Sequence, residues 1–360
     1  MKSLIIQDMK RLGGGRRSAF IFADVLRGLG YETYFVTNVD DINGDKNRVA
    51  IRVNYEFVEN ASMFSNLRKI LKLKKQLSKI DIRGFDFSLN HHPNVFIKKG
   101  TVNILHGFSF LDPWIDESGN FLNHIAPRAI KAVGLYKEYE SSLFIPNSLY
   151  TKNIARMLLP EIGIEGEIGD VLHPPILYEN FHPQEKKRQV IVVGRINWSK
   201  GMEDVLNIAS RVGVKFIIAG FVNPGDEEYV KKLQSKAGKN VEIRKNISED
   251  EKKELMIESS TILSVNRKEN FGISTAEAMN YGCVPIVPKS GGQWIDIVDE
   301  GRYGFGFNDE DEIDELILRS FELGVNDRER IAKSIARFSM DVFISKLRDI
   351  VNRSTSNRTL

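Results

Sequence analysis

Short apolar runs alternate with amphipathic segments along most of the chain. The apolar runs at 3–7, 33–37 and 101–105 have the length and composition of buried strands. Between the first two runs, residues 18–29 carry apolar side chains at the three- and four-residue spacing of a helix. Strands that alternate with helices in this way predict an α/β fold with parallel sheets.

The second half of the chain repeats this pattern. Further strands are predicted at 86–89, 143–146, 189–193, 215–219, 240–244, 261–265 and 283–287, and further helices at 130–142, at 202–212, from 273 onward and at 338–352. Ser248 and Glu251 have the spacing of a capping box, in which two side chains bond to the backbone at a helix start. The proline-rich segment 173–184 resists both helix and strand, so it is predicted to link two domains.

Composition narrows the class of protein. Hydrophobic residues make up 42% and charged residues 28% of the 360 residues, which is typical of a globular protein, and the net charge of +3 does not indicate nucleic-acid binding. Cys283 is the single cysteine, so no internal disulfide is expected and a reducing compartment fits. No apolar run approaches the roughly 20 residues that cross a bilayer. We therefore expect a cytoplasmic protein, peripheral on the inner face of the membrane if it meets a membrane.

Residues 66–80 form a basic amphipathic segment. Six lysines and arginines accompany leucines and isoleucines that share one helical face. One interpretation is a surface helix that packs its apolar face on the core. The other is a helix that docks on anionic lipid or receives an anionic acceptor. Both interpretations are compatible with one another.

The segment 266–282 contains the clearest candidate chemistry. An apolar strand leads into a loop with Glu269 and Phe271-Gly272, and a helix then carries Glu277. A helix N-terminus offers unpartnered N–H groups that bind phosphate, and carboxylates accept hydrogen bonds from sugar or ribose hydroxyls. This layout suits a nucleotide-sugar, although an ordinary strand-turn-helix with solvated glutamates has the same pattern.

Two further strand ends carry candidate ligand-binding residues. Arg195 and Lys200 follow the strand at 189–193, where both cations can reach one diphosphate. His106 follows the strand at 101–105, and ligands of open α/β sheets gather at such carboxyl ends. His91 and His92 lack a third ligand for a metal site, and Asp309 with Asp311 fits an acidic helix start better than a metal pair.

Together these motifs resemble those of the family 4 glycosyltransferases. The resemblance rests on Glu269 and Glu277 with Phe271-Gly272 between them, on Gly194-Arg195 followed by Lys200-Gly201, and on the glycine pair Gly13-Gly14. It extends to the block from Gly291 to Gly304, where Asp296 replaces the usual glutamate. The resemblance implies the GT-B fold, with two Rossmann-like domains that face a central cleft. It implies an N-terminal domain over 1–180 that is completed by the helix 338–352, and a donor-binding domain over 181–337.

The same resemblance implies a role for each matching residue. Catalytic residues would be His106, Glu269, Arg195 and Lys200. Donor-binding residues would be Gly13, Gly14, Arg195, Lys200, Asn246, Ile247, Asn270, Phe271, Gly272, Ile273, Ser274 and Glu277. In these roles the two cations hold the diphosphate, Glu277 binds the ribose, and Glu269 and His106 orient the sugar.

The expected activity is retaining transfer of a hexose from a UDP- or GDP-linked sugar to a glycan or lipid-linked acceptor. No metal and no other cofactor is expected, because Arg195 and Lys200 would neutralise the phosphates. Two alternatives stay open. The first is a sugar-nucleotide epimerase of the same architecture, and the second is a non-catalytic protein that binds sugar-nucleotides or glycans.

Overall fold

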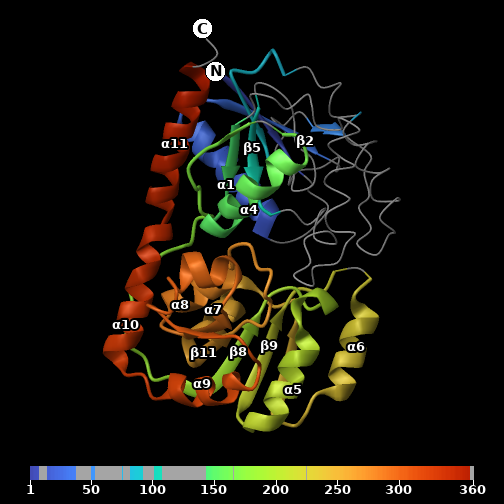
Figure 1. The fold of residues 1–360 in the computed structure, drawn as a ribbon, viewed down its shortest axis with the longest axis vertical. Coiled ribbons are helices and arrows are strands. Elements are labelled where there is room, and N and C mark those ends of the chain that lie inside the picture. The colour runs from blue at the N-terminus through green and yellow to red at the C-terminus, as the bar shows by residue number, and fades with distance from the viewer. Residues whose placement is uncertain are drawn as a thin grey trace. The chain divides into compact units, whose positions relative to one another are not determined.

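The computed structural model describes residues 1–7, 14–37, 50–52, 75, 82–91, 101–107, 143–164, 166–223 and 225–356 (Figure 1). The chain divides into two compact units, of which the first is Met1–His173 with Ile344–Leu360 and the second is Pro174–Phe343. The sequence analysis placed these boundaries after residues 180 and 337. The predicted helix 130–142 and all of the basic segment 66–80 except Lys75 lie outside the described residues.

The first unit is built on a parallel sheet. In the described residues its strand order is β3-β2-β1-β4-β5-β6-β7. The strands are β1 (Lys2–Ile6), β2 (Glu32–Thr37), β3 (Ala50–Arg52), β4 (Phe87–Asn90), β5 (Val102–Leu105), β6 (Leu143–Pro146) and β7 (Glu167–Ile168). The five strands predicted in this unit are confirmed, with ends that shift by one residue at most.

Three helices accompany this sheet in the described residues. They are α1 (Gly14–Gly28), α4 (Leu149–Glu161) and α11 (Met340–Ser356). The predicted start of the first helix at residue 18 was wrong, because its first turn is Gly-Gly-Arg-Arg and shows no apolar periodicity. The last helix was predicted at 338–352. It instead follows a 3₁₀ turn over Ile335–Phe338 and extends to Ser356.

The second unit repeats the strand order of the first. In the described residues its sheet runs β10-β9-β8-β11-β12-β13, and every pairing is parallel. The strands are β8 (Lys187–Val193), β9 (Lys215–Gly220), β10 (Val241–Lys245), β11 (Ser259–Leu263), β12 (Val284–Pro288) and β13 (Phe305–Phe307). Because β9 follows β8 on one side and β11 lies on its other side, the order reverses between β8 and β11. This reversal is the topological switch point of a Rossmann-like fold.

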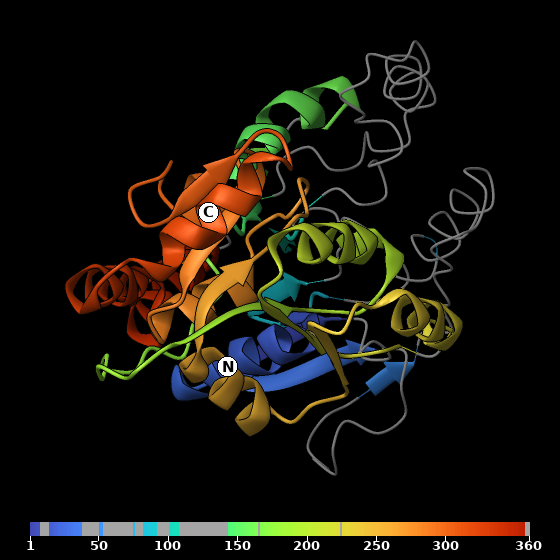
Figure 2. The same ribbon diagram turned by 90° about the horizontal axis from the view of Figure 1, so that it is seen from below.

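Helices cover both faces of this second sheet (Figures 1 and 2). One layer contains α5 (Met202–Val212), α6 (Glu227–Lys236) and α9 (Glu312–Phe321), and the other contains α7 (Glu249–Glu258), α8 (Ile273–Asn280) and α10 (Val325–Ser334). Alternate residues of β8 face opposite layers, so Val190 and Val192 pack with α5 while Ile191 packs with α7 and α8. Burial of both faces explains why β8 is a continuous apolar run rather than an alternating one.

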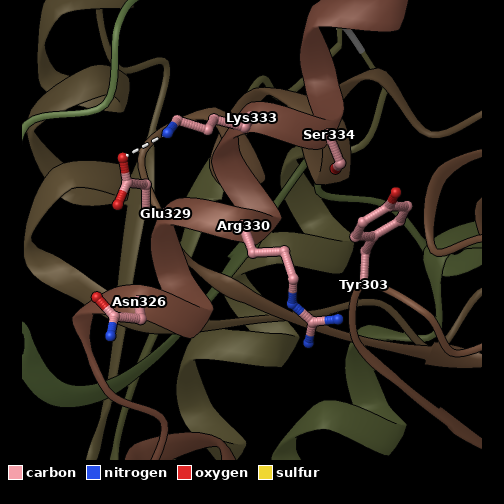
Figure 3. Close-up of a pocket in the computed structure, with 6 residues that line it drawn as sticks. All are labelled: Tyr303, Asn326, Glu329, Arg330, Lys333 and Ser334. Carbon is pink, nitrogen blue, oxygen red and sulfur yellow. Dashed lines mark ion pairs between the residues drawn. The ribbon is translucent and has the colours of Figure 1, made fainter.

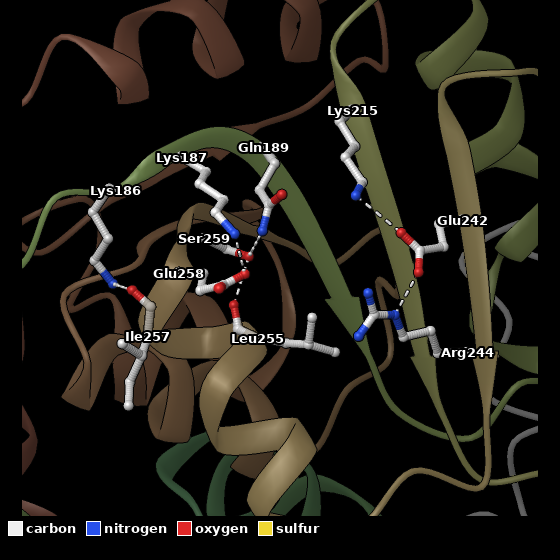
Figure 4. A network of polar contacts seen from close by, with 10 residues as sticks. All are labelled: Lys186, Lys187, Gln189, Lys215, Glu242, Arg244, Leu255, Ile257, Glu258 and Ser259. Carbon is white, nitrogen blue, oxygen red and sulfur yellow. Dashed lines mark hydrogen bonds and ion pairs between the residues drawn. The ribbon is translucent and has the colours of Figure 1, made fainter.

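Buried hydroxyl groups join the end of α7 to the start of β11 (Figure 4). The Ser259 hydroxyl donates to the Leu255 carbonyl at 2.7 Å and accepts a hydrogen bond from the Gln189 amide at 3.0 Å. Ser259 and Ser260 are therefore buried in a strand although both are polar. The strand was predicted at 261–265 and is found at Ser259–Leu263, because these bonds let two serines, which no apolar pattern marks, lie buried in it.

Lys186, which follows the proline-rich linker, bonds to the same part of the second unit. Its ammonium donates to the carbonyl oxygens of Met256, Ile257 and Tyr281, at 3.1, 2.6 and 2.6 Å. Cations are favourable at such helix C-termini. Burial holds the pKa of Lys186 below its ordinary value, and burial raises the pKa of the neighbouring Cys283 thiol. This cluster fixes the C-terminal ends of α7 and α8.

Candidate functional site

The candidate site lies at the switch point of the second unit. Two loops begin at the carboxyl ends of the adjacent strands β8 and β11, one over 194–201 and the other over 264–272. The first leads through a 3₁₀ turn, Trp198–Lys200, into α5, and the second leads into α8. Ligands of open α/β sheets bind at this position because the two loops diverge there and leave a crevice.

An ion pair joins the two loops. The Lys200 ammonium lies 2.5 Å from the Glu269 carboxylate, although the residues are 69 positions apart in the chain. The Asn266 side-chain amide donates to the same carboxylate oxygen at 3.1 Å. The side chains of Lys200 and Glu269 are 23% and 24% exposed, so both remain within reach of a ligand.

The electrostatics of this pair keep Glu269 ionised. Burial by itself raises the pKa of the Glu269 carboxyl, but the charge and hydrogen bond of Lys200, the Asn266 amide and the charge of Arg195 together lower that pKa below its ordinary value. Arg195 is half-buried at the end of β8. The two loops therefore bring two cations, Arg195 and Lys200, together with one carboxylate, that of Glu269.

Close backbone contacts build the cationic loop. A Cβ atom on Gly220 would lie 1.7 Å from the Gly194 carbonyl oxygen, so the ends of β8 and β9 approach more closely than any other residue allows. The Gly194 N–H donates to the Ala219 carbonyl at 3.1 Å. Gly201, with φ of 67°, ends the 3₁₀ turn in the left-handed region. These contacts fix the backbone from which Arg195 and Lys200 project.

Glycines also build the loop before α8. Gly272 has φ of 99°, and a Cβ atom there would lie 2.5 Å from Cγ of Gln293. Gly291 and Gly292 pack against the same loop, and the Gly292 N–H donates to the Glu269 carbonyl at 2.7 Å. The N-terminal turn of α8, which contains Ile273 and Ser274, begins directly after Gly272. The chain thus presents the N–H groups of a helix start beside Lys200 and Glu269.

Glu277 extends the site along α8. Its carboxylate lies 3.0 Å from the Lys252 ammonium on the neighbouring helix α7. The predicted capping box that starts α7 is confirmed, since Ser248 accepts from the Glu251 N–H and the Glu251 carboxylate accepts from the Ser248 N–H. Glu277 is therefore held between two helices whose starts both face the carboxyl ends of the strands.

The other predicted donor-binding residues of this unit lie in the loops of these strand ends. Asn246, in the left-handed region, follows β10, and its side-chain oxygen accepts from the Val222 N–H at 3.0 Å. Ile247 is buried among Leu255 and its neighbours. The Asn270 backbone contacts Gly292, and the Phe271 ring packs edge-on against Phe338 with centroids 5.2 Å apart.

The first unit contains the remaining predicted residues. His106 directly follows β5, as expected, and its ring meets the His91 ring at a centroid distance of 4.1 Å. His91 is buried, with one ring nitrogen 2.6 Å from the Gln7 side-chain oxygen and the other 3.2 Å from the Ser18 hydroxyl. Gly14 is the first residue of α1, and Gly13 lies outside the described residues.

Three side chains at the site were missed by the sequence analysis. Asn266 bonds to Glu269, Lys252 bonds to Glu277, and Gln293 links the Ser264 hydroxyl at 2.9 Å to the Thr275 hydroxyl at 3.1 Å. Gln293 follows a glycine pair, which was a signal for a close approach of two loops. Nothing in the sequence pairs Lys252 with Glu277, because the contact depends on how α7 packs on α8.

One open pocket lies elsewhere in the second unit (Figure 3). Its volume is about 380 Å³, and its lining residues are Tyr303, Asn326, Glu329, Arg330, Lys333 and Ser334. Lys333 and Glu329 pair with each other at 2.7 Å within α10. Tyr303 precedes β13, so this pocket lies toward the amino ends of the strands and apart from the candidate site.

Neither a metal cluster nor a membrane span occurs in the part of the chain that the structure describes. No three His, Cys, Asp or Glu side chains gather there as they would around a metal ion. Asp311 precedes α9, and Glu312 accepts hydrogen bonds from the N–H groups of Asn308 and Asp309 at that helix start. No helix within the same residues is long and apolar enough to cross a bilayer.

Comparison with known proteins gives matches for both the second unit and the whole fold. Residues 178–338 match the family model of glycosyl transferases group 1. The chain is 24% identical to trehalose synthase of Pyrococcus horikoshii over 314 residues, which cover 78% of this chain and 72% of that protein. It is 29% identical to glycogen synthase of Aquifex aeolicus over 145 residues, which cover 39% of this chain and only 31% of that protein.

A solved structure resembles nearly the whole chain. This is Anabaena HepE in complex with UDP and glucose, with a TM-score of 0.68 at 15% identity, covering 98% of this chain and 100% of that one. At this identity the likeness shows the fold, and both structures share the two Rossmann-like units of the GT-B fold. The chain thus has the GT-B fold, and its residues 178–338 match the model of the group 1 glycosyltransferases.

Proposed function

We propose that the protein is a retaining glycosyltransferase of family 4, which moves a hexose from a UDP- or GDP-linked sugar to a glycan or lipid-linked acceptor. The match to the model of the group 1 glycosyltransferases supports the class of reaction. The solved complex of HepE with UDP and glucose supports a nucleotide-sugar as the donor.

The observation that carries this proposal is the ion pair between Lys200 and Glu269 at the switch point. The pair brings a phosphate-binding type of residue within 2.5 Å of a hydroxyl-binding one. A donor with a diphosphate next to a sugar has a partner for each residue, since its phosphates suit the lysine and its sugar hydroxyls suit the glutamate. The phosphate oxygens of such a donor would bind the Lys200 ammonium and the Arg195 guanidinium. The Glu269 carboxylate, released from Lys200, would then accept hydrogen bonds from the sugar hydroxyls.

The neighbouring residues offer contacts for the remaining groups of the donor. The N–H groups at the start of α8 add donors to the phosphates, and Glu277 accepts from the ribose hydroxyls. The nucleobase would lie beside the loop that contains Asn246 and Ile247. His106 of the first unit is the proposed further contact of the transferred sugar.

Charge development on the leaving diphosphate is the main chemical problem of this reaction. Arg195 and Lys200 supply two positive charges where that negative charge grows, so they stabilise the transition state electrostatically. This set of cations supports a metal-independent reaction. A basic segment at 66–80 supports an anionic or membrane-bound acceptor, with the protein peripheral to the membrane.

The experiment is a transfer assay with UDP- and GDP-hexoses on wild type and on two double variants. Arg195→Ala/Lys200→Ala removes the proposed clamp, and we expect kcat/KM to fall at least about a thousandfold. Lys187→Ala/Arg188→Ala is the matched control, because it removes one Lys and one Arg from the amino end of the same strand, where both are exposed and pair with Glu258 and Glu322. We expect this control to retain wild-type kcat/KM.

The same assay separates the proposal from its rivals. An epimerase would convert the donor without any acceptor, and a binding protein would leave it intact. A glycosyltransferase releases nucleoside diphosphate in proportion to added acceptor, and NMR of the product reports whether the anomeric configuration is retained. Equal activity with magnesium and with a chelator is the expected result for a metal-independent enzyme. Wild-type transfer by Arg195→Ala/Lys200→Ala would refute the phosphate assignment.

A further inference from the structure

Two adjacent lysines on α7 form ion pairs with different parts of the second unit. Lys252 lies 3.0 Å from the Glu277 carboxylate on α8 and 2.7 Å from the Glu249 carboxylate on its own helix. Lys253 lies 2.7 Å from the carboxylate of Glu179 in the linker. The two pairs have similar distances and neighbouring positions but involve different partners.

Burial distinguishes the pair that involves Glu277. The side chains of Lys252 and Glu277 are only 15% and 14% exposed, whereas those of Lys253 and Glu179 are partly open to solvent. A charge that is largely removed from water needs an opposite charge close by. Lys252 therefore both balances the charge of Glu277 and fixes its carboxylate in one orientation. The capping box at the start of α7 fixes the turn from which Lys252 projects.

We propose that Lys252 is a positioning residue for ribose recognition. It holds the Glu277 carboxylate in the orientation that accepts hydrogen bonds from the ribose hydroxyls of a nucleoside diphosphate. This inference rests on the proposed function, because it assigns Glu277 to the ribose. It adds that discrimination between ribose and deoxyribose depends on a residue of α7 that acts through Glu277.

The chemistry predicts a specific consequence. A carboxylate accepts strong hydrogen bonds from a vicinal diol only when it is correctly oriented. Without Lys252, the Glu277 side chain loses the charge that orients it, and its contact with the 2′-hydroxyl weakens. The phosphate contacts of Arg195 and Lys200 are on other loops and remain. The loss therefore falls on ribose recognition rather than on binding in general.

The test measures the dissociation constants of UDP, GDP and ADP, each beside its 2′-deoxy form, by titration calorimetry. Lys252→Met keeps an unbranched apolar side chain, one atom shorter than lysine, and removes its charge. We expect it to reduce the preference for the ribose form by about tenfold, the size of one hydrogen bond to a charged group. Lys253→Met is the matched control on the same helix and should keep the wild-type preference. Lys252→Arg restores the charge and should recover most of it.

Further variants distinguish positioning from other roles. In a Glu277→Gln background, Lys252→Met should cause no further loss of ribose preference, since both changes remove the same interaction. If Lys252→Met does not fold, as judged by urea denaturation, Lys252→Gln replaces it. Equal weakening of ribose and deoxyribose forms by Lys252→Met, or an unchanged preference, would overturn the inference. If wild type binds none of the three nucleotides, the proposed function fails instead, which is a different result.

Discussion

The two units share a strand order but place different side chains at the switch point. In the first unit, Gln7 follows β1 and His91 follows β4, and the buried His91 ring bonds to Gln7 and Ser18. In the second unit, the loops after β8 and β11 contribute the half-buried pair of Lys200 and Glu269. In the described residues, the first switch point carries a buried, hydrogen-bonded polar network, and the second carries a half-buried ion pair.

This difference shows that topology provides the position and the loops provide the chemistry. The same fold can place a hydrogen-bonded ring or a pair of opposite charges at a switch point. A diphosphate needs cations, and in the described residues the second switch point contributes them through Lys200 and Arg195. Donor binding by the second unit therefore stays our proposal, and the three predictions below test the difference between the two switch points.

The largest expected effect concerns the glycine that shapes the charged loop. Gly272→Ala adds a Cβ atom in a left-handed backbone, 2.5 Å from Gln293, and should lower the free energy of unfolding by about 3 kcal/mol in urea denaturation. Gly213→Ala is the matched control, since Gly213 is also left-handed but has no atom within 4 Å of the added Cβ. It should cost about 1 kcal/mol. Equal losses for both variants would mean that the close approach is unimportant.

A smaller effect is expected at the first switch point. His91→Ala removes a buried ring and leaves Gln7 and Ser18 without that partner, so the free energy of unfolding should fall by about 2 kcal/mol. UDP affinity, measured by calorimetry, should stay within about twofold of wild type, which is less than 0.5 kcal/mol. His182→Ala, in the exposed linker, is the control for both measurements. Loss of UDP affinity without loss of stability would assign a donor role to the first switch point.

The smallest effect is a pH dependence of the charged pair. The pKa of Glu269 is below its ordinary value of 4.5, because the interactions with Lys200 and Asn266 outweigh burial. A depressed folded-state pKa stabilises the protein above the ordinary value, and this stabilisation is lost as the pH falls through the folded-state pKa. The free energy of unfolding of wild type should therefore exceed that of Glu269→Gln by about 1 kcal/mol at pH 7, and the difference should disappear as the pH falls through the folded-state pKa of Glu269. A difference independent of pH would contradict the ion pair.

Much of the fold was predictable because burial on both faces produces continuous apolar strands. The runs at 143–146 and 215–219 correspond to β6 and β9, and helix α5 has the predicted bounds. The α6 helix was missed because only Val230 and Leu233 of its ten residues are buried, so its apolar periodicity is weak. Asp309 and Asp311 were predicted to lie at an acidic helix start, and α9 begins at Glu312, directly after Asp311.

The site was predictable in its motif residues but not in its partners. Arg195, Lys200 and Glu269 could be identified because glycines and strand ends mark their loops. The pairing of Lys200 with Glu269 spans 69 positions, and that of Lys252 with Glu277 spans 25. Such contacts depend on the order of strands and the packing of helices, which a local pattern does not contain. The roles of these residues toward a donor stay predictions.

The most direct test of the account is a thermal-shift comparison with UDP, GDP, ADP and their sugar conjugates. Wild type, Arg195→Ala/Lys200→Ala and Lys187→Ala/Arg188→Ala would each be measured with ligand in large excess. A nucleotide at a hundred times its dissociation constant adds about 2.7 kcal/mol to the native state. The account predicts that at least one nucleotide stabilises wild type and the amino-end control, and that the stabilisation is absent in Arg195→Ala/Lys200→Ala. Stabilisation that persists in that variant, or no stabilisation of wild type by any nucleotide, would contradict donor binding at the second switch point.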